Sequence, residues 1–158
     1  MKYLIKVLFF FYSQISKMQQ YFLFKYYRKS GAIIGKNTYL GPNVYLDVSH
    51  KPGKIVIGDN CYVTRNSSIL VHSYAFLGGP LQKWKGKGGE RLIGNIIIGD
   101  NVFIGFHCVV LPGVSIGDNA VIGAMTLVNK DVPMNAIVVG VPGKIVGYIT
   151  DKVSIYNE

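Results

Sequence analysis

Residues 96–128 read "IIIGDNVFIGFHCVVLPGVSIGDNAVIGAMTLV", and an aliphatic residue returns in them at every sixth position. The six positions are Ile98, Ile104, Val110, Ile116, Ile122 and Val128. A helix repeats its apolar face at about 3.6 residues and a strand at 2, so neither element alone produces this period. The period predicts a unit of one short strand and one turn, repeated along the chain.

The same period continues upstream. The earlier aliphatic positions, which like the six above we call leads, are Ile34, Leu40, Leu46, Ile57, Val63 and Ile69. The fifth residue of most units is small; these small positions are Thr38, Val44, Cys61, Ser67, Ser73, Val102, Cys108, Val114, Ala120 and Thr126. Glycine often follows a lead, as in "IGDN" and "IGKN", and Gly and Asn both tolerate the positive φ angles of tight turns. One large and one small inward residue per unit predict a narrow interior.

Strands and turns with no helix between them predict an all-β solenoid of parallel strands. Three units per coil give a triangular prism whose coils stack at about 4.8 Å and pair through their backbones. An ordinary β-sandwich is the alternative, but a sandwich does not need a glycine-linked period of six. Cys61 and Cys108 fall at small inward positions, so we expect buried packing thiols rather than a disulfide framework or a metal-ligand pair.

This repeat resembles the left-handed parallel β-helix of the hexapeptide-repeat acyltransferases, and the left hand is implied by the resemblance alone. The resemblance covers most of the chain. We therefore divide the chain into a basic, aromatic helical segment (1–30), a left-handed β-helix acyltransferase domain (31–149) and a C-terminal tail (150–158). A long loop, 75–97, is inserted after the second coil.

The composition is that of a globular domain. The chain has 158 residues, of which 49% are hydrophobic and 16% are charged. The net charge of +9 is uneven, because no acidic residue precedes Asp47. The run "YLIKVLFFFY" is too short for a membrane span and lacks a small-residue cleavage site after it. We therefore expect no signal peptide and a cytoplasmic protein.

Two interruptions break the repeat. Leu46 and Ile57 stand 11 positions apart, which leaves five extra residues near "HKPGK". Ile69 and Ile98 stand 29 positions apart, and the 23 extra residues are rich in glycine and lysine and include the only tryptophan. Long loops in compact domains are often functional, so we expect the site near these insertions.

His72 directly precedes the second insertion, in "SILVHSYAF". In the hexapeptide-repeat acetyltransferases that the chain resembles, a histidine at this place is the general base, and the resemblance assigns that role to His72. An imidazole suits the role because it ordinarily titrates near pH 6.5, and no covalent acyl-enzyme is needed. Many relatives have aspartate next, where this chain has Ser73. The group that orients the imidazole is therefore left open, with a backbone carbonyl as one alternative.

His50 is the rival base, or a helper, because the unbroken register sets it one coil from Ser73. The serine acetyltransferases carry their catalytic histidine in a Leu-Asp-His stretch, to which "LDVSHKPGKIVIG" is similar. On the same grounds Asp47 is a candidate orienting carboxylate. The "LGG" and "GGER" of the insertion resemble the glycine-rich loop of those enzymes, but the histidine that follows their loop is replaced here by Leu92.

His107, in "IGFHCVV", belongs to the second unit of its coil. We expect it on a different side of the prism from His72, as a surface or interface residue. The three histidines are 22 and 35 positions apart. The repeat-containing carbonic anhydrases need two of their three zinc ligands five positions apart, so we expect no metal.

The segment "NKDVPMNAIVVGVPGKIVGYI" resembles the last coil and tail of the acetyl-CoA-dependent members of this family. The resemblance implies acetyl-CoA as co-substrate, with its pantetheine arm in a groove between two subunits. The positions that match the family's binding residues are Phe106, Ala124, Asn129, Lys130 and Lys144. Backbone amides beside small residues can hold a thioester oxygen, and lysine supplies charge to phosphate. A site shared by subunits and flat prism faces predict a homotrimer.

The segment "MKYLIKVLFFFYSQISKMQQYFLFKYYRKSG" interleaves aromatic and basic residues and predicts one or two helices that end near Gly31. Two interpretations stand side by side. Either the helix covers the exposed strand edge at the prism end, or it lies on anionic lipid as a peripheral membrane contact. We expect no nucleic-acid partner, because the solenoid offers no known groove-reading element.

Together these inferences predict an acetyl-CoA-dependent O-acetyltransferase acting on a sugar hydroxyl in surface polysaccharide biosynthesis, at the inner face of the membrane. The polysaccharide would be a capsule, an exopolysaccharide or an O-antigen. The alternatives are a serine acetyltransferase, an amino-sugar N-acetyltransferase and, from another class, a non-catalytic solenoid scaffold. Release of CoA thiol in the presence of an acceptor separates an enzyme from a scaffold.

Overall fold

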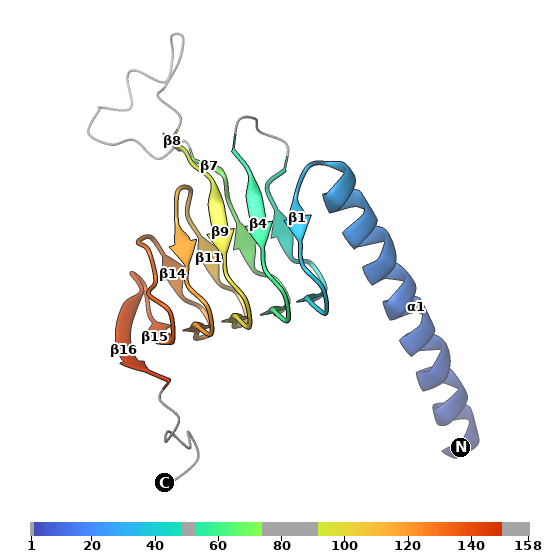
Figure 1. The fold of residues 1–158 in the computed structure, drawn as a ribbon. Coiled ribbons are helices and arrows are strands. Elements are labelled where there is room, and N and C mark those ends of the chain that lie inside the picture. The colour runs from blue at the N-terminus through green and yellow to red at the C-terminus, as the bar shows by residue number, and fades with distance from the viewer. Residues whose placement is uncertain (1, 49–52, 74–91, 150–158) are drawn as a thin grey trace, which may run out of the picture.

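The computed structural model describes residues 2–48, 53–73 and 92–149 (Figure 1). One helix, α1 (Lys2–Lys29), precedes a column of short strands. In chain order the strands are β1 (Ile33–Ile34), β2 (Tyr39–Leu40), β3 (Tyr45–Leu46), β4 (Ile55–Ile57), β5 (Tyr62–Val63), β6 (Ser68–Ile69), β7 (His72–Ser73), β8 (Leu92–Ile93), β9 (Ile96–Ile98), β10 (Phe103–Ile104), β11 (Val109–Val110), β12 (Ser115–Ile116), β13 (Val121–Ile122), β14 (Leu127–Val128), β15 (Ala136–Val139) and β16 (Lys144–Tyr148).

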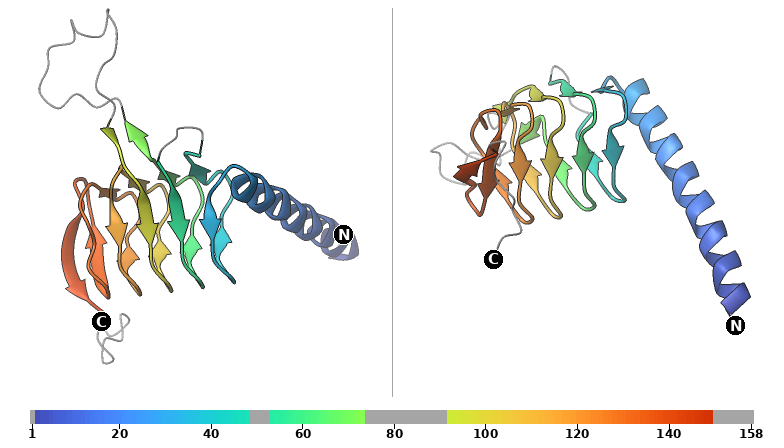
Figure 2. Two further views of the ribbon diagram at one scale, coloured as in Figure 1. Left: turned by 45° about the horizontal axis from the view of Figure 1, so that its top comes forward. Right: turned by 60° about the horizontal axis from the view of Figure 1, so that its bottom comes forward.

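Three sheets form the faces of a triangular prism, which Figure 2 shows from two further sides. The first sheet has the order β1-β4-β9-β12, the second β16-β15-β13-β10-β5-β2 and the third β14-β11-β6-β3. Neighbouring strands are parallel, apart from the antiparallel pair β15 and β16. In this register each lead lies next to the lead of the following coil. In the first sheet, for example, Ile34 pairs with Ile57, and Ile57 pairs with Ile98.

The interior is built from the repeat, as predicted. All twelve leads are at most 6% exposed, and the small positions are also buried, with the exception of Ser73. Ser73 differs because the chain leaves the coil there: β7 pairs antiparallel with β8 instead of continuing around the prism. The regular coil resumes at β9, so the loop predicted over 75–97 ends earlier than expected, and its residues 75–91 lie outside the described ones.

The turns give the prism three long edges. The first edge joins the first sheet to the second, and asparagines there hold positive φ angles of 54–60° in five successive coils: Asn37, Asn60, Asn101, Asn119 and Asn135. Three neighbouring pairs of these side chains hydrogen-bond from coil to coil at 3.0–3.2 Å. Coils also approach closely here, because a Cβ on Gly58 would lie 2.6 Å from the carbonyl oxygen of Gly99. This edge therefore needs the residue types that the repeat supplies.

The second edge, between the second and third sheets, is equally regular. Four residues there have φ angles of 57–61°: Asn43, Asn66, His107 and Met125. The third edge, between the third sheet and the first, is different. It contains the first interruption between β3 and β4 and the second one between β7 and β8. It is thus the edge on which the repeat is broken.

The C-terminal part of α1 covers the first coil, and the helix runs away from the prism toward its N-terminus (Figure 1). The hydroxyl of buried Tyr27 donates to the carbonyl of Val44 at 2.8 Å and accepts from the backbone N–H of Leu46 at 3.2 Å. Gln20 and Arg28 each donate to a further first-coil carbonyl at 2.9 Å. These bonds satisfy backbone groups that have no coil beneath them, in agreement with the interpretation of α1 as an end cap. Within the described ranges, no helix combines the length and apolarity needed to cross a membrane.

Candidate functional site

Asp47 and His72 meet at the third edge. Asp47 follows β3 and its side chain is fully buried, whereas His72 opens β7 one coil further on with its side chain 16% exposed. The backbone N–H of Asp47 donates to the carbonyl of Ile69 at 2.9 Å, which fixes the aspartate against the second coil. A carboxylate oxygen of Asp47 contacts Nδ1 of His72. Of the two orienting groups that the sequence left open, the carboxylate is the one in contact with Nδ1.

This contact has a chemical consequence for the imidazole. An ionised carboxylate only accepts hydrogen bonds, so beside an ionised Asp47 the donor of this contact is Nδ1 of His72. In the neutral ring the lone pair is then on Nε2. A histidine held in this tautomer, and stabilised by a buried negative charge when it gains a proton, is suited to general base chemistry.

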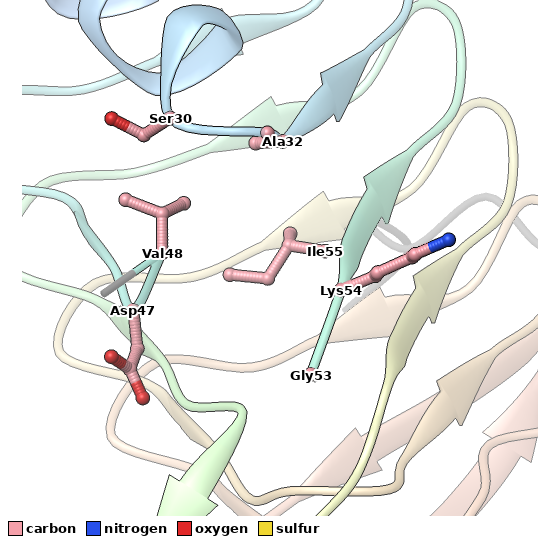
Figure 3. A pocket seen from close by; sticks show the side chains of 8 residues that line it. Ser30, Ala32, Asp47, Val48, Gly53, Lys54 and Ile55 are labelled. Atoms are coloured by element: carbon pink, nitrogen blue, oxygen red, sulfur yellow. The ribbon is translucent and has the colours of Figure 1, made fainter. Parts of the chain in front are cut away.

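A pocket of about 430 Å³ adjoins Asp47 on the side of α1 (Figure 3). The short segment after α1 forms one wall, and the chain on either side of the first interruption forms the others. The lining residues are Ser30, Gly31, Ala32, Asp47, Val48, Gly53, Lys54 and Ile55. His50 belongs to the interruption and lies outside the described residues, so its expected proximity to His72 stays a prediction.

Three of the five predicted acetyl-CoA residues share a second pocket, of about 280 Å³, near the far end of the prism. Asn129 and Lys130 reach it from the last turn of the third edge, and Lys144 reaches it from β16. Asp131 also lines it, although its carboxylate accepts from the backbone N–H of Ser115 at 2.8 Å. Two lysines in one pocket suit a ligand that carries phosphates.

The remaining two predicted residues, Phe106 and Ala124, lie at the second edge in neighbouring coils. The carbonyl of Phe106 accepts from the N–H of Met125 at 2.7 Å, and a Cβ on Gly105 would lie 2.6 Å from the amide nitrogen of Ala124. Strands of the third sheet begin at this edge and end at the edge of His72. One chain therefore holds Phe106 and His72 at opposite borders of the same sheet.

His107 lies beside Phe106, on a different edge from His72, as the sequence predicted. Its Nε2 is 3.2 Å from the side-chain nitrogen of Asn66, so it takes the place of an asparagine in the turns of the second edge. Among the described residues, no three His, Cys, Asp or Glu side chains are grouped as a metal site would require.

Both cysteines are buried, as predicted. The thiol of Cys61 donates to the carbonyl of Gly99 at 3.0 Å, and that of Cys108 to the carbonyl of Gly123 at 3.1 Å. Burial raises the pKa of both thiols above the ordinary value of 9.0. A thiol that is buried and protonated is a poor nucleophile, which agrees with a packing role.

Two family models match the chain. They are "Bacterial transferase hexapeptide (six repeats)" over residues 95–130 and "Hexapeptide repeat of succinyl-transferase" over residues 31–70. Over these two stretches, one on each side of the second interruption, the chain is similar to hexapeptide-repeat transferases.

Similarity to curated proteins extends along most of the chain. The chain is 38% identical over 121 residues to the galactoside O-acetyltransferase of Escherichia coli (strain K12). This alignment covers 75% of this chain and 57% of the relative. The chain thus spans less than two thirds of that relative's length.

Solved structures share the fold. The hexapeptide-repeat acetyltransferase VCA0836 of Vibrio cholerae has a TM-score of 0.65 at 29% identity, covering 76% of this chain and 64% of that one. A galactoside acetyltransferase in complex with coenzyme A has a TM-score of 0.59 at 33% identity, covering 77% and 66%. The predicted fold class, a left-handed parallel β-helix with an N-terminal helical segment, is confirmed.

Proposed function

We propose that this chain is an acetyl-CoA-dependent O-acetyltransferase that acts on a sugar hydroxyl by direct transfer. The observation that carries the proposal is the contact between Nδ1 of His72 and the buried carboxylate of Asp47. The relatives support it, since one is a galactoside O-acetyltransferase and another binds coenzyme A. A non-catalytic scaffold would not require a buried carboxylate beside a partly exposed imidazole.

In the proposed reaction, Nε2 of His72 takes the hydroxyl proton while the acceptor oxygen attacks the thioester carbonyl. Backbone amides hold the carbonyl oxygen while it carries negative charge. The new C–O bond is kept, the C–S bond breaks, and CoA leaves as a thiolate that receives the proton from the imidazolium. Asp47 stabilises the imidazolium between the two proton transfers. His50 stays a candidate helper in this scheme.

The pocket beside Asp47 is our candidate acceptor site. Its lining joins the polar residues Ser30 and Asp47 to the apolar residues Ala32 and Ile55. Sugars carry both hydroxyl groups and apolar ring faces, and small-molecule sites commonly join an apolar lining to a few polar groups. We assign the reaction to surface polysaccharide biosynthesis, in the cytoplasm at the inner face of the membrane.

Acetyl-CoA would lie along the prism toward the pocket of Asn129, Lys130 and Lys144, with its phosphates near the two lysines. This pocket is on the same edge as His72, two coils away or about 10 Å. Phe106 and Ala124 lie at the other border of the third sheet, so they join this site only if a second subunit supplies them. A homotrimer, with each site shared between two subunits, meets that requirement.

The test begins with calorimetric titration of acetyl-CoA into the chain and a mass measurement on the same sample. We expect binding by a trimer, followed by release of CoA thiol when sugars and oligosaccharides are added as acceptors. Thiol release with serine or an amino sugar alone would select one of the alternative enzyme classes. A folded trimer that neither binds acetyl-CoA nor releases thiol would replace the enzyme with the scaffold.

A further inference from the structure

α1 carries an apolar stripe on the side that does not cap the prism. Ile15, Met18, Phe22 and Tyr26 follow each other at spacings of three and four, so they lie on one face of the helix. Their exposed fractions are 48%, 55%, 59% and 59%. The capping residue Tyr27 is about half a turn of rotation away from Phe22 and Met18, because each residue advances the helix by about 100°. The stripe is therefore not explained by the contact with the first coil.

Basic residues extend the stripe toward the end of the helix. Lys25 is three residues after Phe22 and seven after Met18, and Lys29 follows four residues later, so both lie on the stripe's face. Both lysines are exposed. No residue of α1 is acidic, and the first acidic residue of the chain is Asp47. This face of α1 is thus apolar from Ile15 to Tyr26 and positively charged toward the C-terminal end of the helix.

This charge decides what covers the stripe. A second copy of α1 would bring two helices together that carry only positive charge, and like charges on facing helices repel. An anionic lipid surface attracts the lysines and receives the apolar side chains at its headgroup boundary. We propose that α1 binds an anionic membrane surface through Ile15, Met18, Phe22, Lys25 and Lys29. The proposal does not depend on the proposed acetyl transfer.

The helix is long enough for this role and stays attached to the prism. Its 28 residues measure about 42 Å. The three side chains that cap the first coil, Gln20, Tyr27 and Arg28, come from its last ten residues. Gln20 and Tyr27 make their contacts from the face opposite the stripe. Binding of lipid and capping of the prism by these two side chains therefore do not compete.

The experiment is co-sedimentation of the full chain with two sets of vesicles, one of phosphatidylcholine and one in which phosphatidylglycerol is added. We expect binding to the anionic vesicles that weakens with salt, and much weaker binding to phosphatidylcholine alone. Lys25→Gln with Lys29→Gln should lower anionic binding by about thirtyfold, since each basic residue near the surface is worth about 1 kcal/mol. Met18→Ser with Phe22→Ser should lower it by more than about tenfold.

The matched control removes two exposed valines at the far end of the prism, Val141→Ser with Val146→Ser, and should leave binding unchanged. Circular dichroism checks that each variant keeps α1. Equal binding of both vesicle types, no binding to either, or unchanged binding by both α1 variants would overturn the proposal. So would a larger mass in the absence of vesicles that Met18→Ser with Phe22→Ser abolishes, because the stripe would then be covered by a second copy.

Discussion

The first and third edges of the prism are built from the same repeat and carry opposite kinds of structure. At the first edge every coil makes the same turn, with an asparagine at positive φ and amide contacts between coils. At the third edge no asparagine ladder is formed, the chain is interrupted twice, and the only contact of an imidazole with a carboxylate is found there among the described residues.

The comparison shows which edge of the prism can accommodate insertions and reactive side chains. A turn in which a single Cβ would collide with the next coil has no space for an insertion or for a reactive side chain. At the third edge the insertions begin only after the strand has made its backbone bonds, as when Asp47 N–H bonds Ile69 O. The coils therefore hold the reactive groups rigidly while the interruptions supply the surroundings.

The largest expected effect is on turnover at the third edge. We expect His72→Ala to lower turnover by about 10²–10⁴, because the acceptor proton loses its base. The assay is CoA thiol release with the acceptor found in the screen. His107→Asn is the matched histidine variant, since asparagine tolerates positive φ and keeps a side-chain amide for Asn66; its turnover should be unchanged. An active His72→Ala enzyme would transfer the role of base to His50.

The next effect concerns the orienting carboxylate. Asp47→Asn removes the charge from the contact with His72 while keeping the size of the side chain. We expect the rate constant for turnover to fall by about tenfold to a hundredfold, as is common for groups that orient a reactive side chain, with the KM for acetyl-CoA unchanged. Asp100→Asn at the first edge should change neither. A rise in KM without loss of turnover would mean that Asp47 binds substrate instead.

Substitutions at the first edge should lower the free energy of unfolding and leave turnover unchanged. Asn101→Ala places an alanine at a φ of 58° and removes an amide contact with Asn119, so we expect a loss of about 1–2 kcal/mol in the free energy of unfolding. Asn101→Gly removes the contact but accepts the backbone angle, so its loss should be smaller. Urea titration measures both. Equal losses would mean that the amide contact, not the backbone angle, sets the cost.

The smallest effect is a decline of stability at alkaline pH. Burial raises the pKa of Cys61 and Cys108 above 9.0, so the folded state holds these protons more tightly than the unfolded state does. The free energy of unfolding should be level below about pH 9 and fall as pH rises through the raised values. Replacing both cysteines by alanine should make the decline shallower. An unchanged slope would assign the decline to other groups, such as Tyr27, whose pKa burial also raises.

The sequence predicted the interior better than the site. The geometry of the coil fixes the spacing of the leads at six residues. Counting in sixes along the sequence therefore assigns residues such as Ile34 and Val128 to the interior. Ser73 was misplaced because counting assumes that the coil continues, and the strand there pairs with β8. The contact between Asp47 and His72 was predicted as one of several alternatives, since residues 25 positions apart meet only if the first interruption leaves the register intact. The end of the loop was predicted too late in the chain. Leu92 and Ile93 form a strand, but they do not fall at the six-residue spacing of the leads, so counting missed them.

A column of parallel strands has no natural end, since each coil presents the same unpaired backbone groups that the previous one satisfied. In this chain Tyr27, Gln20 and Arg28 occupy those groups on the first coil. The helix therefore blocks the addition of a further strand to the first coil. Without the helix, the free backbone groups of that coil could pair with a strand of another molecule. A chain that lacks α1, Tyr27 included, should therefore be prone to form fibres even though every coil is intact.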